Sequence, residues 1–183
     1  LGLSAVIGLI LGLGLQDTIT NLAAGVWVTV FRPVEMGEFA EVNGISGTVM
    51  GVGIMMTEML KPDNTYITIP NSQVWGNPVI NYSRMETRRL DVTVGVAYDT
   101  DLNKAIRVAT DLMKSHEGVL PSPEPVTVVT ELADSSVNLS LRAWTKTEDL
   151  WGVKWDLTRE IVGAFRDAGI EIPFPQVDVH LDR

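Results

Sequence analysis

The hydrophobic pattern divides the chain into three stretches of different character. Residues 1–31 are almost continuously apolar and hold a single charged side chain, Asp17. Residues 32–83 contain short runs of alternating apolar and polar positions between turn residues, which is typical of β-strands. From residue 84 onward, alternating runs are interleaved with two runs of helical period. The pattern predicts a membrane helix, a small β domain and an α/β domain, in that order.

The first stretch has helix-compatible residues with one polar interruption. Gln16 and Asp17 divide it, and aspartate is a residue type favoured at helix N-termini. We therefore expect two helical halves with a bend near Gln16 and Asp17. The second half should end at Arg32, because Pro33 disfavours helical geometry at the residue before it. The residues before Gln16 reach roughly 22 Å as a helix, against a bilayer core of roughly 30 Å, so this run alone does not prove a membrane span.

The second stretch predicts a small Sm-like barrel or sandwich, because several short strands follow one another closely. An Asn-Gly pair at 43–44 favours a tight hairpin turn. A long run that follows this turn contains internal glycines, and we expect it to be a single strand bent at Gly51 or Gly53. The expected strands are 38–42, 45–60 and 65–69.

The third stretch alternates strand and helix signals in the order β-α-β-β-α-β. This is the ferredoxin-like order, or its first five elements with the last strand used elsewhere. The expected strands are 90–98, 125–132, 136–144 and 177–181, and the expected helices are 101–116 and 149–168.

Composition and charge exclude several classes of function. The chain has 183 residues, with 14 Lys and Arg against 23 Asp and Glu, for a net charge of −9. A surface that binds nucleic acid needs clustered positive charge, so we expect no nucleic-acid partner. There is no cysteine, which excludes thiolate metal sites and cysteine nucleophiles.

Candidate metal and catalytic sites fail on spacing. Three residues match the first ligand positions of a calcium-binding loop, namely Asp99, Asp101 and Asn103. Lys104 and Thr110 then stand where that loop needs glycine and glutamate, so a helix cap around Asp101 is the better interpretation. His116 and His180 have no ligand partner at metal-site spacing. We expect no metal, no cofactor and no enzyme activity.

Two groups of tryptophans have to be assigned either to a surface or to a packed core. Trp27 lies in the apolar stretch, where it can anchor at a membrane interface or pack against the domain that follows; the sequence favours neither. Trp151 and Trp155 are one helical turn apart, and core or interface packing is the usual role of such a pair.

The sharpest pattern lies in the first half of the apolar stretch. At about 100° per residue, Leu9, Leu13 and Gln16 fall on one helix face. Gly8 and Gly12 form a GxxxG pair on the adjacent flank, which lets helices pack closely. Copies packed around a ring would turn Leu9 and Leu13 toward the axis, where two apolar rings form a constriction that water leaves readily. The spacing alone favours the alternative, an ordinary glycine-rich packing helix.

Four runs of sequence resemble the small-conductance mechanosensitive channel family, MscS. They cover nearly the whole chain in order, and they include an FRP triplet, an IPN loop and a closing FPQ. The runs are GLGLQDTITNLAAGVWVTVFRPVEMGEFAEVNGISGTV (12–49), ITIPNSQVWGNPVINYSR (67–84), VGVAYDTD (94–101) and WDLTREIVGAFRDAGIEIPFPQVDVHL (155–181).

The resemblance implies an architecture for the whole chain. Residues 1–31 would be the pore-lining helix of a homoheptamer, with leucine rings at Leu9 and Leu13 and with its second half, 18–31, along the membrane surface. A β domain (32–83), an α/β domain (84–175) and a strand of a small barrel (176–183) would follow. Two further membrane-spanning helices are expected before Leu1.

The resemblance also implies a function and a location. The family's channels open under membrane tension and release ions and small solutes on hypo-osmotic shock, so we expect the protein in the inner cell membrane, with residues after about 32 in the cytoplasm. Two other classes stay open at this point. A membrane-anchored ring or scaffold would bind a cytoplasmic partner without conducting. A soluble RNA-binding module is disfavoured by the acidic balance and by the lack of an RNP motif.

Overall fold

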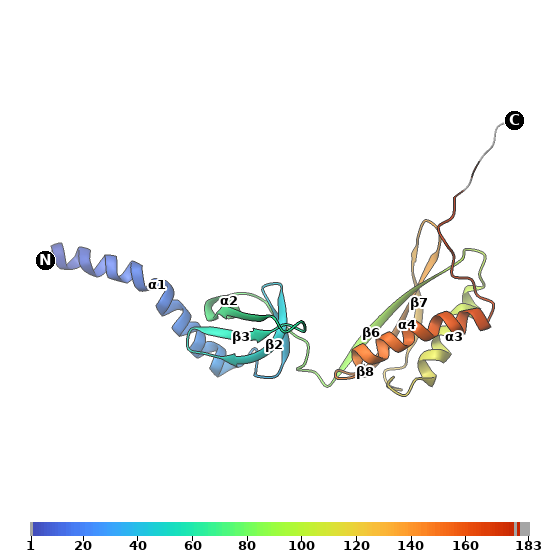
Figure 1. Cartoon of the computed structure of the whole chain (residues 1–183), viewed down its shortest axis with the longest axis horizontal. Helices are drawn as coiled ribbons and strands as arrows, with labels where there is room; N and C mark the ends of the chain where they lie inside the picture. The colour runs from blue at the N-terminus through green and yellow to red at the C-terminus, as the bar shows by residue number, and fades with distance from the viewer. Residues whose placement is uncertain (1, 178, 180–183) are drawn as a thin grey trace. The chain divides into compact units, whose positions relative to one another are not determined.

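The computed structural model describes residues 2–177 and 179 and divides into two compact units, Leu1–Arg84 and Met85–Arg183 (Figure 1). The first unit holds a long helix and a β domain, and the second is an α/β domain. The predicted order of helix, β domain and α/β domain is therefore confirmed.

The N-terminal helix α1 runs without interruption over Gly2–Phe31. The separate N-cap expected at Asp17 is wrong, because this residue lies inside the helix. The carbonyls of Gln16 and Asp17 do receive extra hydrogen bonds, from Thr20 Oγ1 at 2.8 Å and from Asn21 Nδ2 at 2.9 Å. Side-chain bonds to the carbonyl four residues back bend helices, and Figure 1 shows the axis of α1 changing direction part-way along its length.

The β domain is a five-stranded antiparallel sheet with the order β4-β3-β2-β1-β5, and a short helix, α2, follows β4. Its elements are β1 (Phe39–Val42), β2 (Ile45–Val52), β3 (Met56–Leu60), β4 (Tyr66–Pro70), α2 (Asn71–Gly76) and β5 (Val79–Asn81). Asn43 and Gly44 both have positive φ, 51° and 78°. This is the backbone that the predicted Asn-Gly hairpin turn requires.

The long strand expected over 45–60 is wrong, because the chain reverses there and forms the β2–β3 hairpin. The Gly53 amide donates to the Met56 carbonyl at 2.8 Å and closes the turn. Ile54 and Met55 occupy this turn, so the polar residues that usually mark a reversal are missing. Helix α2 was also not predicted, since six residues are too few to show a helical period.

The core of the β domain includes part of α1. Val28 of the helix is buried together with residues from the α1–β1 connection, from four strands and from α2. These are Val34, Ala40, Val42, Val49, Met59, Ile69 and Val74. The second half of α1 is therefore a structural part of the first unit.

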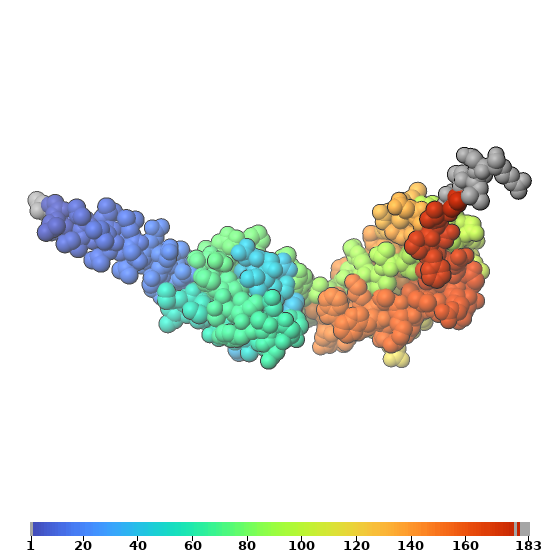
Figure 2. Space-filling view, turned by 45° about the horizontal axis from the view of Figure 1, so that its top comes forward, coloured from blue at the N-terminus to red at the C-terminus, as the bar shows by residue number. Residues whose placement is uncertain are grey.

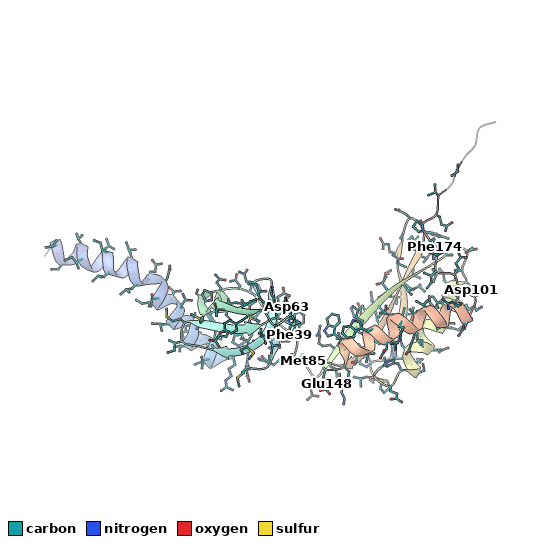
Figure 3. The ribbon with its side chains drawn as sticks, in the orientation of Figure 1. Phe39, Asp63, Met85, Asp101, Glu148 and Phe174 are labelled. Atoms are coloured by element: carbon teal, nitrogen blue, oxygen red, sulfur yellow. The ribbon has the colours of Figure 1, made fainter. Side chains whose placement is uncertain are left out.

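The second unit has the strand order β6-β8-β7, with α3 and α4 packed against each other and against the sheet. Its elements are β6 (Thr87–Val96), α3 (Leu102–Ser115), β7 (Val126–Leu132), β8 (Val137–Lys146) and α4 (Leu150–Asp167). They give the first five elements of the ferredoxin-like order, as predicted. Asp101, labelled in Figure 3, caps α3 by accepting from the Lys104 amide at 3.1 Å. The strand expected at 177–181 includes residues outside the described part of the chain.

Candidate pore helix and its seat on the β domain

The first half of α1 makes no packing contact with the rest of the described chain. Leu9 and Leu13 are 63% and 64% exposed, and no residue before Ala24 in this helix is buried. Figures 2 and 3 show these first turns standing clear of the β domain, with their side chains projecting on all sides. Among the described residues, α1 is the one helix that is long and apolar enough to cross a membrane by length and composition.

The glycines of the first half have no neighbour within the chain. A Cβ atom built on Gly8 or on Gly12 would meet nothing within 4 Å. The fold of a single chain therefore does not require glycine at either position. Any steric reason for these two residues has to come from outside the described chain, such as a second helix packed against α1.

The second half of α1 is seated tightly on the β domain. Ala24, Gly25 and Val28 are buried there. A Cβ atom on Gly25 would overlap the carbonyl oxygen of Ile54 and would lie 2.6 Å from Nδ2 of Asn71. Only glycine permits this approach of the helix backbone to the β2–β3 turn.

Asn71 is fully buried and lies directly beneath Gly25 of α1, next to the β2–β3 turn. Its Oδ1 accepts a hydrogen bond from Oγ1 of Thr57 at 2.9 Å. Its Nδ2 donates to the carbonyls of Gly53 and Ile54 at 2.9 and 3.1 Å. The backbone N–H of Asn71 donates to the Met55 carbonyl. Because every polar atom of this side chain is paired, the β2–β3 turn is held in one position under the helix.

A second bond joins α1 to α2. Oδ1 of Asn21 accepts from the Ser72 amide at 3.0 Å. This amide lies in the first turn of α2, where backbone N–H groups have no partner within the helix. The bond therefore satisfies a free donor and sets the two helices against each other.

The end of α1 is clamped by an ion pair. Glu38 and Arg84 form a bidentate pair at 2.7 and 2.8 Å, and the same guanidinium donates to the Arg32 carbonyl at 3.1 Å. Asn81 and the Glu35 amide also donate to Glu38. The hydrogen bonds from Arg84 lower the pKa of Glu38 to about 2 from its ordinary 4.5, against the opposing effect of burial.

Comparison with known proteins decides what kind of module this is. The family model described as "Mechanosensitive ion channel, beta-domain" matches residues 17–84, and "Mechanosensitive ion channel MscS, C-terminal" matches residues 90–172. The chain belongs to the MscS family. This is a family of channels and not of enzymes.

Individual MscS proteins support this assignment. The chain is 39% identical over 174 residues to the small-conductance mechanosensitive channel of Edwardsiella ictaluri, covering 95% of this chain and 61% of that protein. It therefore spans about three-fifths of that relative's length. Helicobacter pylori MscS, solved in its closed state, matches with a TM-score of 0.94 and 25% identity over 100% of this chain and 72% of that one.

A more distant structure shares the fold alone. Arabidopsis thaliana MSL1 matches with a TM-score of 0.82 at 18% identity, covering 94% of this chain and 65% of that one. The MscS architecture of long helix, β domain and α/β domain thus accounts for the described elements of this chain.

The residues predicted from the sequence fall into two sets within this MscS chain. Leu9, Leu13, Gly8 and Gly12 lie on exposed turns of α1 and are not brought to any other element. Gln16 and Asp17 lie mid-helix, where their carbonyls carry the extra side-chain bonds. The roles expected for these six positions stay predictions.

The seat of α1 was missed by sequence reasoning. Asn71 was not singled out, since no spacing distinguishes a buried asparagine from a loop asparagine. Its place in the IPN loop was the one signal available. Glu38 and Arg84 are far apart in sequence, so no local pattern predicted that they form an ion pair.

No metal-binding group of three or more His, Cys, Asp or Glu occurs among the described residues. Nδ1 of His116 accepts from the Gly118 amide at 3.1 Å, and Nε2 lies 3.7 Å from the carboxylate of Asp156. His116 is thus engaged in local structure at the end of α3, and His180 lies outside the described residues.

Proposed function

We propose that the full-length protein is a mechanosensitive ion channel in which α1 lines the pore. The observation that carries this proposal is the contrast along one helix: its first half is apolar and contacts no other element of the described chain, while its second half packs tightly on the β domain. Exposed apolar surface of this size needs lipid or other protein around it. Packing between copies, together with the bilayer, would supply both. Ions and small solutes would then leave through the pore on hypo-osmotic shock.

Two leucine rings would form the gate. In a homoheptamer, Leu9 and Leu13 of each copy would face the axis, and Gly8 and Gly12 would let neighbouring helices approach closely. A narrow apolar neck loses its water and blocks ions without a plug. Tension favours the wider state, because it does work on the difference in area between the two states. Bending near Gln16 and Asp17 would let the pore half move while the second half stays seated.

The location follows from the same helix. Its first half would lie in the inner membrane with two further spans of the full-length protein, and residues after about 32 would be cytoplasmic. A mass measurement of the detergent-solubilised protein tests the subunit number. Seven copies per particle are expected.

The deciding experiment is patch-clamp recording of the full-length protein in liposomes under graded suction. We expect stepwise currents above a threshold, and a lower threshold for Leu13→Ser, because a hydroxyl wets the neck. Leu11→Ser is the matched control. At about 100° per residue it places the same change on the opposite face of α1, and we expect it to keep the parental threshold.

Two results would contradict the proposal. Equal effects of Leu13→Ser and Leu11→Ser would remove the leucine gate. Silence of all variants with verified insertion would remove the channel and support the membrane-anchored ring, which predicts no current at any suction.

A further inference from the structure

Three aromatic rings form a stack across α1 and α2. Trp27, Phe31 and Trp75 have ring centroids 5.6 to 6.2 Å apart, with interplanar angles between 24° and 29°. The stack joins two helices of the first unit, yet Trp27 and Trp75 remain 46% and 45% exposed and Phe31 is 62% exposed. The rings therefore hold one another in place while each keeps an open face.

The segments that carry the stack contain no charge. No Asp, Glu, Lys or Arg occurs in residues 18–31 or in residues 64–83, although 20% of the chain is charged and its net charge is −9. Ile19, Val26 and Val30 of α1 are also apolar and exposed, and they border the β2–β3 turn. Although the chain as a whole is acidic, residues 18–31 and 64–83 therefore contribute no carboxylate to this face.

The β2–β3 turn adds uncharged surface along another flank of α1. Residues 42–57 are likewise free of charged side chains, and Ile54 at the tip of the turn is 76% exposed. An apolar groove of about 520 Å³ runs between this tip and the second half of α1. Turn tips in contact with water are normally polar, so the composition of this one points to surroundings other than water.

We propose that this uncharged face lies in the headgroup region of the lipid bilayer, with Trp27 and Trp75 as its anchors. Tryptophan suits this depth, because its ring packs against acyl chains while its indole N–H bonds to headgroups. The face is continuous with the apolar first half of α1, which argues for lipid as its occupant. The inference rests on the proposed membrane location of α1. It adds that the β domain touches the bilayer itself, through Trp75 of α2.

The tryptophan pair of the second unit provides an internal contrast. Trp151 and Trp155 are also exposed on α4, with ring centroids 6.3 Å apart. Lys154 lies over the Trp151 ring at 5.7 Å, and Asp156 pairs with Arg159 beside them. Surrounded by charge, this pair has the setting of a water-exposed surface, and it is the natural control.

The test is fluorescence quenching in vesicles of phosphatidylcholine brominated near the headgroup end of its acyl chains. The full-length protein is compared with Trp27→Phe/Trp75→Phe and with Trp151→Phe/Trp155→Phe. Phenylalanine keeps the stack, and circular dichroism checks the fold. We expect the first double variant to lose more than about half of the emission that the bromine quenches. The second double variant should lose none.

Depth and occupant are tested in the same way. Bromine placed near the chain ends should quench Trp27 and Trp75 less than bromine near the headgroups. If the quenchable emission is unchanged in Trp27→Phe/Trp75→Phe, the proposal is overturned. Emission that is shielded from water yet not quenched by either lipid would indicate that a second copy covers the face, which also overturns it.

Failure of this inference and failure of the proposed channel are distinguishable. Quenching requires only inserted protein, whereas gating requires current. A silent protein with quenched Trp27 and Trp75 would retain the anchors and lose the channel. A conducting protein with unquenched tryptophans at these positions would lose the anchors alone.

Discussion

The two halves of α1 have similar apolar compositions and opposite relations to the rest of the chain. In the first half, Leu9 and Leu13 are exposed and a Cβ on Gly12 would meet nothing. In the second half, Val28 is buried and Gly25 lies against the β2–β3 turn. An apolar helical sequence therefore specifies a need for burial but not the partner: the β domain buries the second half, whereas the described chain offers nothing to bury the first.

The largest expected effect is Gly25→Val, which should unseat the second half. Its side chain would collide with backbone and with a fully paired asparagine, neither of which yields easily, so we expect a loss at the upper end of about 1–3 kcal/mol in the free energy of unfolding. Thermal unfolding of the protein in detergent, followed by circular dichroism, measures it.

Gly12→Ala is the matched change in the first half. It should leave the stability of the chain's own fold within about 0.5 kcal/mol and act on gating tension instead. Similar losses of stability from both substitutions would break the contrast between the halves.

Next in size is Asn71→Ala, which removes the support under Gly25. The Thr57 hydroxyl and the Gly53 and Ile54 carbonyls would lose their partner, at a cost of about 2 kcal/mol. Asn77→Ala, at an amide that follows α2 and donates to the Gln73 carbonyl of that helix, should cost less than about 0.5 kcal/mol. Unfolding curves of the two variants, measured side by side, would count against the seat if the two losses were equal.

A smaller effect concerns the clamp at the end of α1 and depends on pH. The folded-state pKa of Glu38 is depressed to about 2 from 4.5. Its contribution to stability is therefore fully present above about pH 4.5 and is lost as pH falls toward 2. Glu38→Gln should lower the unfolding temperature at neutral pH, and its difference from the parent should shrink through this window. A difference that stayed constant from pH 7 to pH 3 would exclude the ion pair as its source.

The smallest effect is expected at the boundary between the halves. Asp17 is exposed in mid-helix, and seven copies near a pore mouth would add negative potential that disfavours anions. Asp17→Asn should shift the reversal potential in a salt gradient toward chloride. The isosteric amide keeps the helix, so an unchanged reversal potential would place Asp17 away from the ion path.

Sequence patterns predicted the regular elements better than the site. The helices and strands of the second unit were found within a few residues, because each buries one face and so shows a clear period. The β2–β3 reversal was missed because Ile54 and Met55 are not turn residues, and α2 was missed because it is short. The seat of α1 was out of reach, since Asn71, Thr57 and Gly25 meet only in three dimensions.

The order of the three parts, and the apolar character of the first, can be read from the sequence alone. Local periodicity marks helices and strands, and one charge in residues 1–31 marks a helix that avoids water. Which half of that helix packs on the β domain is visible only in the folded chain. A hydrogen bond from Asn71 to the Ile54 carbonyl, and the close approach of Gly25 to both, depend on distances between segments far apart in the chain. The pattern of apolar and polar residues along a chain indicates whether each residue is buried, whereas tertiary packing determines which neighbour buries it.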